Sequence, residues 1–365
     1  MQNTGVSRRT FAQTIAAGAA LASIPRIALA AATKRVSSTG LVRLSANENP
    51  YGPSLKAMNA MTEALQAAPR YPDELTEALC ADVAKFHNVS CDEVLLGDGS
   101  SDILRLVASA YGGAGKKLVM ADPTFEAIGH YAQTNGTEVV KVPLDAAFAH
   151  DLDKMRSADI VYICNPNNPT GTITPKARIR EFIAAVPQST TVLVDEAYHH
   201  YANSADYESV MPLVMTTPNL IVARTFSKIY AMAGVRAGYC VAKKSVINKL
   251  SATQQWDAMN VVALAGARAS LADSEHVITG RRHNDETKKW LVAQMKAAGY
   301  EVLPSETNFV MIDVRREVKP LIGSIREHGV HVGRLFPAMP HHLRVTIGRP
   351  EEMARFVDAF KASMA

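Results

Sequence analysis

Cysteine is scarce in this sequence, and its spacing does not suggest a metal site. The 365 residues include four cysteines, none of which forms a C-x-x-C pair or another spacing typical of metal ligands. We therefore predict no metal site. Cys164 and Cys240 lie in apolar runs and are predicted to be buried free thiols. Cys80 and Cys91 could pair in an oxidising compartment, but we expect both to remain unpaired.

Long apolar runs and an excess of one charge are also missing after the N-terminus. No later stretch approaches the about 18 apolar residues that a membrane-spanning helix needs. The formal net charge is +4, and three positive charges (Arg8, Arg9 and Arg26) lie in the first thirty residues, which contain no acid. The remainder is close to neutral, so we expect neither nucleic-acid binding nor stable insertion into a membrane.

The N-terminus has the pattern of an export signal. "SRRTFAQTIAAGAALASIPRIALAAA" runs from paired arginines through a segment of small apolar residues to Ala28-Leu29-Ala30. This layout predicts a signal peptide of the twin-arginine type over residues 1–32, and a periplasmic or otherwise exported protein. The alternatives are a disordered basic tail or an amphipathic surface helix, in which case the protein would be cytoplasmic.

Alternating apolar runs and helical patterns predict an α/β fold. In "KARIREFIAAV", Ile179, Phe182, Ile183 and Val186 recur with the period of one helix face. Near-continuous apolar strands between such helices favour a mostly parallel sheet covered on both faces. The strand-like runs are 93–97, 117–121, 160–164, 191–195, 220–224 and 238–242. Ligands of such sheets bind beyond the carboxyl ends of the strands.

The pattern also predicts how the chain is divided. Residues 75–275 would form a large domain around the sheet. Residues 276–365 would form a smaller α+β domain, with strands in "TNFVMIDV" and "LRVTIG" and a helix beginning at Pro350. Residues 33–74 would be an N-terminal segment that joins the small domain.

Polar residues follow several of the predicted strands. "GDGSSD" (97–102) is a glycine-rich turn before a helix, which offers backbone N–H groups to an anion. Phe125 follows the next strand, and "NPNNPTG" (165–171) places amide side chains in a rigid turn. A helix cap or a tight turn would explain each feature separately, but their common position favours a shared site.

The later strands add ionisable groups at the same edge. Asp195 and Tyr198 follow one strand, and Lys228 follows the next, between hydroxyl residues and Arg236. Separately, each could be a cap, a packing residue or a surface charge. Together they match the needs of pyridoxal phosphate, which requires a lysine amine for its aldehyde, an acid for its pyridine nitrogen and an anion site for its phosphate.

Ordered motifs give the chain a family resemblance. They are "LSANENPYGPS", "RYPD", "GDGSSD", "DPTF", "NPNNPTG", "VDEAY", "RTFSKIYAMAGVRAGY", "TNF" and "LRVTIGRPEE", from residue 44 to about residue 352. In these segments the chain resembles the class I/II aminotransferases of fold type I, and within them the histidinol-phosphate aminotransferase-like branch. The resemblance implies the pyridoxal-phosphate transferase fold and that cofactor.

The resemblance also implies roles for residues around the reacting part of the cofactor. Lys228 would form the internal aldimine and carry the proton. Asp195 would pair with the pyridine nitrogen, and Phe125 would stack on the ring. Tyr198 and Asn168 would bind the phenolic oxygen of the ring.

Further residues are implied as ligands of phosphate and substrate. The residues implied to hold the phosphate are Ser100, Ser101, Thr225, Ser227 and Arg236. Tyr71 would reach the phosphate of a neighbouring subunit, which implies a homodimer with shared sites. Arg344 and Arg334 would bind the substrate, since a guanidinium suits a carboxylate or a phosphate.

The function implied is transamination by a ping-pong mechanism between an amino acid, or a histidinol phosphate-like amine, and a 2-oxo acid. The alternative is a decarboxylase of the threonine-phosphate type, followed by a non-catalytic protein that binds the cofactor. Residues 33–43 lack the tyrosine that histidinol-phosphate enzymes carry before "NENP". Export would also separate the enzyme from the cytoplasmic pathway to histidine. Both departures favour an amino acid substrate.

Overall fold

The computed structural model of the protein describes residues 40–365. The predicted signal peptide, residues 1–32, lies outside this part of the chain. Residues 41–365 form one compact unit. Within residues 40–365, no helix combines the length and the apolar character needed to cross a membrane.

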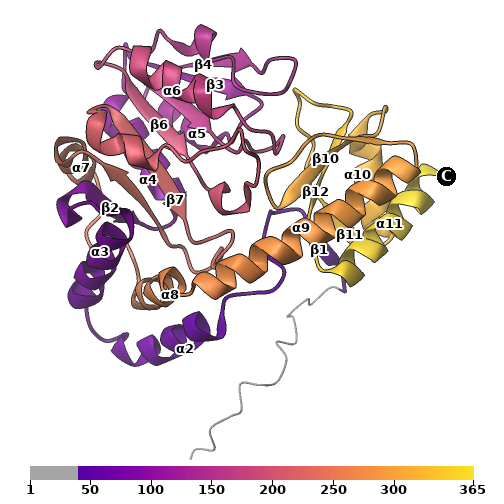
Figure 1. Ribbon diagram of the computed structural model, residues 1–365, viewed down its shortest axis with the longest axis horizontal. Helices are drawn as coiled ribbons and strands as arrows, with labels where there is room; N and C mark the ends of the chain where they lie inside the picture. The colour runs from indigo at the N-terminus through magenta and orange to yellow at the C-terminus, as the bar shows by residue number, and fades with distance from the viewer. Residues whose placement is uncertain (1–39) are drawn as a thin grey trace, which may run out of the picture. The chain divides into compact units, whose positions relative to one another are not determined.

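A seven-stranded sheet, mostly parallel, carries the larger part of the unit (Figure 1). The strands lie in the order β2-β8-β7-β6-β5-β3-β4. The central pairs are parallel, whereas β8 is antiparallel to both β7 and β2. The strands are β2 (Val94–Gly97), β3 (Lys117–Asp122), β4 (Glu138–Pro143), β5 (Ile160–Cys164), β6 (Thr191–Asp195), β7 (Leu220–Thr225) and β8 (Gly238–Ala242).

Both faces of this sheet are buried, because successive residues of each strand point to opposite sides. On β6, Val192 and Val194 belong to one apolar core, while Leu193 belongs to the other. The first core includes α2 (Leu55–Ala64), α3 (Asp73–His87), α6 (Lys176–Ala185) and α8 (Val261–Leu271). The second includes α4 (Ser100–Tyr111), α5 (Ala127–Thr134) and α7 (Lys244–Ser251).

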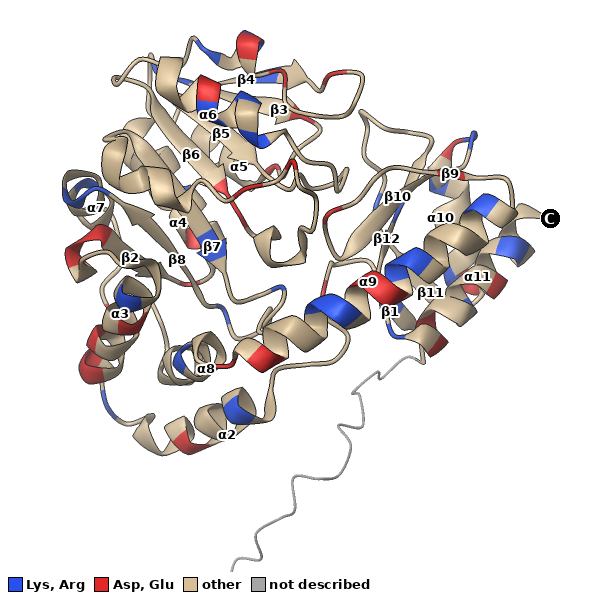
Figure 2. Cartoon of the chain, in the orientation of Figure 1, with Lys and Arg blue, Asp and Glu red and all other residues tan. Residues whose placement is uncertain are grey.

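A third core lies between two small sheets and three helices near the C-terminus. β10 lies between β12 and β9, and β1 pairs in parallel with β11. The strands are β1 (Val42–Leu44), β9 (Glu301–Val302), β10 (Phe309–Asp313), β11 (Val330–Val332) and β12 (His342–Thr346). The helices are α9 (Ser274–Ala297), α10 (Val318–Glu327) and α11 (Pro350–Met364). The long helix α9 leads from α8 toward α11 and carries charges of both signs on its visible face (Figures 1 and 2).

The predicted strands and helices are largely confirmed. Three strand ranges, 160–164, 191–195 and 238–242, agree at both ends, and α11 begins at Pro350 as expected. The sequence did not indicate β4, an edge strand whose residues are mostly half-buried or exposed. The division into a large and a small domain stays a prediction, because residues 41–365 separate into several cores but form one compact unit.

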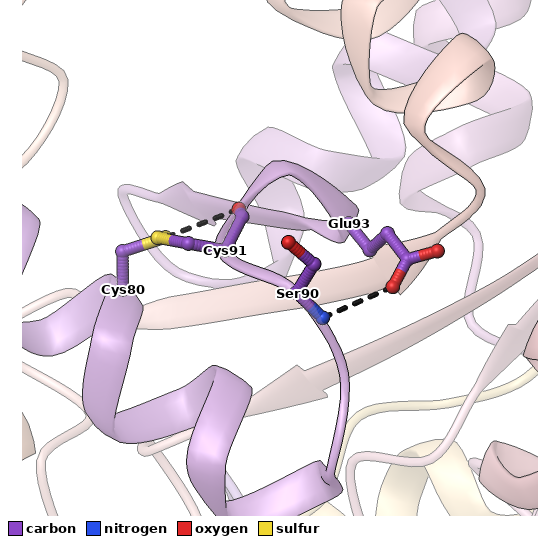
Figure 3. The surroundings of a disulfide bond; sticks show 4 residues. All are labelled: Cys80, Ser90, Cys91 and Glu93. Carbon is purple, nitrogen blue, oxygen red and sulfur yellow. Dashed lines mark hydrogen bonds between the residues drawn. A yellow bond between two sulfur atoms is a disulfide. The ribbon is translucent and has the colours of Figure 1, made fainter.

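One prediction about cysteine is wrong. Cys80 on α3 and Cys91, in the short helical turn before β2, form a disulfide, with their Cα atoms 5.7 Å apart (Figure 3). After α3 ends, the left-handed conformation of Asn88 (φ 55°) turns the chain back toward the helix. The turn is also fixed by the Ser90 N–H, which donates to Glu93 Oε2 at 3.0 Å. Cys164 and Cys240 are buried and free, as predicted.

Candidate functional site

Two neighbouring cavities lie at the carboxyl ends of β5, β6 and β7. The inner cavity, of about 140 Å³, is lined by Ser100, Ser101, Phe125, Cys164, Asn168, Asp195, Ala197, Tyr198, Thr225, Ser227, Lys228, Ala233 and Arg236. The outer cavity, of about 440 Å³, shares Phe125, Asn168, Tyr198 and Lys228 with it and adds the arginines 334 and 344. The structure therefore brings together every predicted site residue except Tyr71.

An anion cradle forms the floor of the inner cavity. Gly99 has φ 77°, a left-handed conformation that lets the chain turn directly into α4. A Cβ atom at Gly99 would overlap the Arg236 guanidinium, so a side chain there would displace that cation as well as strain the backbone. The N-terminus of α4, with the Ser100 and Ser101 N–H groups, is thus placed beside a cation, as an anion site requires.

Hydroxyl groups extend this cradle. Thr225 Oγ1 donates to Ser227 Oγ at 2.9 Å and accepts from the Ser227 N–H at 3.0 Å. Arg236 Nη1 donates to Ser227 Oγ at 3.4 Å, and Arg236 Nη2 donates to the Asp98 carbonyl at 3.3 Å. The guanidinium is therefore held by backbone and hydroxyl oxygens and faces no carboxylate among these contacts.

Lys228 occupies the boundary between the two cavities. Its Nζ lies 3.5 Å from the Ala46 carbonyl and 5.6 Å from the centroid of the Tyr198 ring. Burial lowers the pKa of Lys228 to about 8, and the nearby Arg344 charge acts in the same direction. A lysine with a lowered pKa keeps part of its amine unprotonated near neutral pH, which makes it a nucleophile.

Asp195 ends β6 and is almost fully buried. Its Oδ2 accepts a hydrogen bond from the Tyr162 hydroxyl at 3.0 Å, and its Oδ1 accepts from the Ala197 N–H at 3.1 Å. Burial raises the pKa of Asp195 to about 6, against the effect of both hydrogen bonds, which lower it. The carboxylate can therefore carry a charge at neutral pH and pair with a buried cation.

Tyr198 contacts a segment near the start of the described chain. Its hydroxyl accepts from Asn47 Nδ2 at 2.9 Å, and its ring packs edge-on against Phe309 at 5.3 Å. Burial raises the pKa of Tyr198 above its usual value, so the phenol stays protonated and can donate. Asn47 is itself held by Thr346 and Asn308, which ties this segment to the small sheet.

Arg344 closes the inner side of the outer cavity. Its Nη1 donates to Asn168 Oδ1 at 2.7 Å, and its Nη2 donates to the Ser45 carbonyl at 2.8 Å. Its Nε is buried and without a hydrogen-bond partner. Burial lowers the pKa of Arg344 to about 10, which still leaves it charged at neutral pH. An anion in this cavity would meet a fixed guanidinium with no carboxylate bonded to it.

Arg334 lies at the outer rim and is paired differently. It forms an ion pair with Glu126, and about half of each side chain is exposed. The Phe336 ring lies between the two arginines, 4.5 Å from Arg334 Cζ and 5.0 Å from Arg344 Cζ. The rim of the outer cavity thus carries a paired cation and anion, Arg334 and Glu126, whereas its inner part carries the cations Arg344 and Lys228.

Sequence reasoning missed several residues of the site and left one untested. Tyr162, Asn47, Glu126 and Phe336 contact predicted site residues but were not singled out. Tyr162 lies in an apolar run that was interpreted as packing. Asn47 lies inside the motif "LSANENPYGPS" but received no role, and Glu126 and Phe336 lie outside the quoted motifs. Tyr71 is 80% exposed in this chain, so its predicted contact with a neighbouring subunit stays a prediction.

Comparison with known proteins decides the family. The model of the family "Aminotransferase class I and II" matches residues 39–360. The chain belongs to the class I and II aminotransferases. A curated relative of this aminotransferase, the histidinol-phosphate aminotransferase of Symbiobacterium thermophilum, is 39% identical over 330 residues, covering 89% of this chain and 91% of that protein.

Solved structures agree with this family. A structure from Erwinia carotovora atroseptica, described as a histidinol-phosphate aminotransferase, superposes with a TM-score of 0.86 at 34% identity. The match covers 88% of this chain and 95% of that one. The histidinol-phosphate aminotransferase of Sinorhizobium meliloti, solved with pyridoxal-5'-phosphate, gives a TM-score of 0.84 at 25% identity, covering 89% and 90%. The predicted fold, a pyridoxal-phosphate transferase of fold type I, is confirmed.

The residues of the inner cavity fit that cofactor. The cradle at Gly99 would hold its phosphate, Asp195 would meet its pyridine nitrogen, and Lys228 provides the amine for its aldehyde. Three charges of the right sign therefore occur in one small cavity. The residues 40–365 contain no cluster of three or more side chains suited to a metal ion.

Proposed function

We propose that the protein is a pyridoxal-phosphate-dependent aminotransferase that moves an amino group between an anionic amino donor and a 2-oxo acid. The observation that carries this proposal is the inner cavity, where Lys228, Asp195 and the cradle around Arg236 meet. Bound there, the cofactor supplies an electron sink for the carbanion formed at the donor's Cα. The residues of the chain supply binding, orientation and proton transfer.

Lys228 is the group best placed to move the proton. Its Nζ lies at the boundary of both cavities, so it can reach a donor in the outer cavity and a cofactor in the inner one. Its lowered pKa, about 8, suits a group that must both take up and release a proton near neutral pH.

The substrate is oriented by Arg344. This guanidinium is fixed by Asn168, which lines both cavities, and by the Ser45 carbonyl. A carboxylate or a phosphate bound to Arg344 would hold the donor with its amine toward Lys228. Relatives more than 30% identical are named histidinol-phosphate aminotransferases, which supports an amine with one strong anionic group. The decarboxylase alternative has less support from these relatives.

The decisive test is spectroscopic. The purified full chain, given pyridoxal phosphate, should become yellow and should bleach when an amino donor is added. Lys228→Ala should abolish turnover and the absorption of the lysine imine, while retaining measurable binding of the free aldehyde through the phosphate cradle. A protein that is colourless after incubation with the cofactor and removal of the unbound excess would contradict the proposal.

A donor screen would then define the substrate. Histidinol phosphate, aromatic amino acids, basic amino acids and acidic amino acids should be compared by kcat/KM with one 2-oxo acid. Carbon dioxide release from O-phosphothreonine without amino transfer would instead favour the decarboxylase.

We also propose that the protein is an exported homodimer. The "SRRTF" start and the Ala28-Leu29-Ala30 sequence support export, and so does the Cys80–Cys91 disulfide, because disulfides persist mainly in oxidising compartments. The exposed Tyr71 supports a partner subunit that covers it. Fusing residues 1–40 to a reporter that is active only after export tests the first part, and Arg8→Lys with Arg9→Lys should abolish its export.

A further inference from the structure

We propose that Tyr162 is a positioning residue that holds the Asp195 carboxylate at the cavity wall in the orientation and charge state that a protonated pyridine nitrogen requires. This inference rests on the proposed cofactor function. Neither the family motifs quoted above nor the lining of the inner cavity includes Tyr162. Its effect would pass entirely through Asp195.

The strand register explains how Tyr162 reaches Asp195. On the parallel pair β5–β6, Cys164 lies opposite Asp195, and Tyr162 lies opposite Leu193. Residues two apart on a strand point to the same face, so Tyr162 and Cys164 share the side of the sheet on which Asp195 lies. The tyrosine side chain is long enough to span that offset, and its hydroxyl ends 3.0 Å from Asp195 Oδ2.

The hydrogen bonds leave Asp195 able to bind one more donor. Tyr162 binds Oδ2, and the Ala197 N–H binds Oδ1. A carboxylate has about four acceptor positions, so these two contacts fix its plane and still leave positions for a donor in the cavity. Two fixed contacts on different oxygens prevent the carboxylate from rotating away from the cavity wall.

Toward the ionised Asp195 carboxylate, Tyr162 acts as a donor. The residue is fully buried, and burial, followed by the Asp195 charge, raises the pKa of Tyr162 well above its usual value. A phenol that never ionises near neutral pH stabilises the charged form of its neighbour. Burial alone would favour the neutral form of Asp195, and the two hydrogen bonds are the largest effects that favour its ionised form.

Other groups also act on Asp195, and their effects must be separated from that of Tyr162. Two of the charged and titratable groups that act on Asp195 come from β5, namely Tyr162 and Cys164. The others are Glu196 and Tyr198, which follow Asp195 in the chain, and Lys228, which follows β7. Lys228 favours the charged carboxylate, whereas Glu196 disfavours it. A Tyr162 substitution leaves all of these groups in place.

The test compares Tyr162→Phe with a matched control, Tyr239→Phe. Tyr239 is also a buried tyrosine of the same sheet, but its hydroxyl contacts His87 at 2.8 Å and not the cavity. The full chain is freed of cofactor, and the Kd for pyridoxal phosphate is measured by calorimetry between pH 5 and pH 10. Tyr162→Phe should weaken binding by up to about tenfold at pH 5, below the pKa of Asp195, because one pKa unit corresponds to that factor there.

The pH profile distinguishes positioning from packing. Without Tyr162 the pKa of Asp195 rises, so the carboxylate becomes protonated at a higher pH and the loss of affinity on acidification begins earlier. Above both pKa values, the two proteins should bind more nearly alike. In an Asp195→Asn background, Tyr162→Phe should no longer change the pH profile.

Two results would overturn the inference: an unchanged Kd and pH profile in Tyr162→Phe, or the same change in Tyr239→Phe. If Tyr162→Phe does not fold, Tyr162→Met, which also lacks the donor, is measured in its place. If the wild-type protein itself binds no pyridoxal phosphate, the proposed function fails. If the wild-type protein binds it and the variant matches, only this inference fails.

Discussion

At the scale of single residues, charge rather than shape distinguishes the site from the rest of the sheet edge. Lys228 and Arg344 are cations whose pKa values are lowered, chiefly by burial, while burial raises that of Asp195. Burial thus brings the pKa values of Lys228 and Asp195 nearer to neutral pH. Each can then respond to the loss of one neighbouring charge.

Cofactor uptake should follow the protonation of Lys228. Below a pH of about 8 the amine is mostly protonated, so the rate of uptake by the cofactor-free protein should rise with pH and level off above that value. Arg344→Gln removes a cation that lowers the pKa of Lys228, so the midpoint of the pH dependence of uptake should move to higher pH in that variant. Glu48→Gln removes an anion that raises the same pKa, so its midpoint should move to lower pH.

Stopped-flow absorbance at a series of pH values measures these midpoints. Shifts in the same direction for the two variants would contradict the electrostatic explanation.

Donor choice should depend on Glu126 at the rim. Because Glu126 neutralises Arg334, Glu126→Gln should free a cation for donors with a side-chain carboxylate or phosphate. We expect kcat/KM for such donors to rise by about two- to fivefold, as suits an exposed ion pair, with little change for neutral donors. Glu138→Gln, which loses an exposed partner of Lys117 away from the cavities, is the control. An equal gain for neutral donors would count against this role.

At the scale of the elements, the sequence predicted where strands and helices lie, because burial and periodicity determine that. It did not predict strand direction or contacts between strands, because these depend on pairing. The apolar runs of β5, β6 and β8 were recognisable because both faces of the sheet are covered. The antiparallel direction of β8 was not, since an apolar run has no direction. The side chain of Tyr162 was classed with that packing because its partner, Asp195, lies on another strand.

The disulfide was missed for a similar reason. A spacing of 11 residues between Cys80 and Cys91 does not reveal that the chain reverses after α3. Only the left-handed Asn88 and the Ser90–Glu93 turn bring the two Cα atoms together. The cofactor residues were easier to predict, because each follows a strand end within a recognisable motif.

This disulfide should stabilise the fold without taking part in the chemistry. Replacing both cysteines by serine should lower the free energy of unfolding by about 3 kcal/mol, the value expected for so short a closed loop. Denaturant unfolding measures the change, and kcat should stay the same because neither cysteine lines the inner or outer cavity. Wild-type protein treated with a reductant should match the double variant. An unchanged unfolding free energy would show that the bridge contributes little to stability.

At the scale of the whole molecule, the described unit presents an exposed tyrosine, Tyr71, that lines neither the inner nor the outer cavity of its own chain. If sites are shared between subunits, two inactive variants should complement each other. Mixed Lys228→Ala and Tyr71→Phe subunits should form dimers in which one site has both changes and the other has neither.

Statistical mixing would then restore about one quarter of wild-type activity. Subunits are mixed after mild dissociation, and turnover is compared with that of each variant alone. Activity equal to the average of the two separate variants would show that Tyr71 does not act across subunits.

The segment just after β1 limits where the proposed leader could be removed. Ala46 contacts Lys228, Asn47 binds Tyr198, and the Ser45 carbonyl holds Arg344, while β1 itself is paired with β11. If the proposed leader is removed, the cut must therefore fall before Val42. Residues 33–41 separate the predicted leader from β1, and the site segment Ser45–Asn47 follows that strand directly. A cut inside β1 or beyond it would therefore remove residues that hold Arg344, Lys228 and Tyr198.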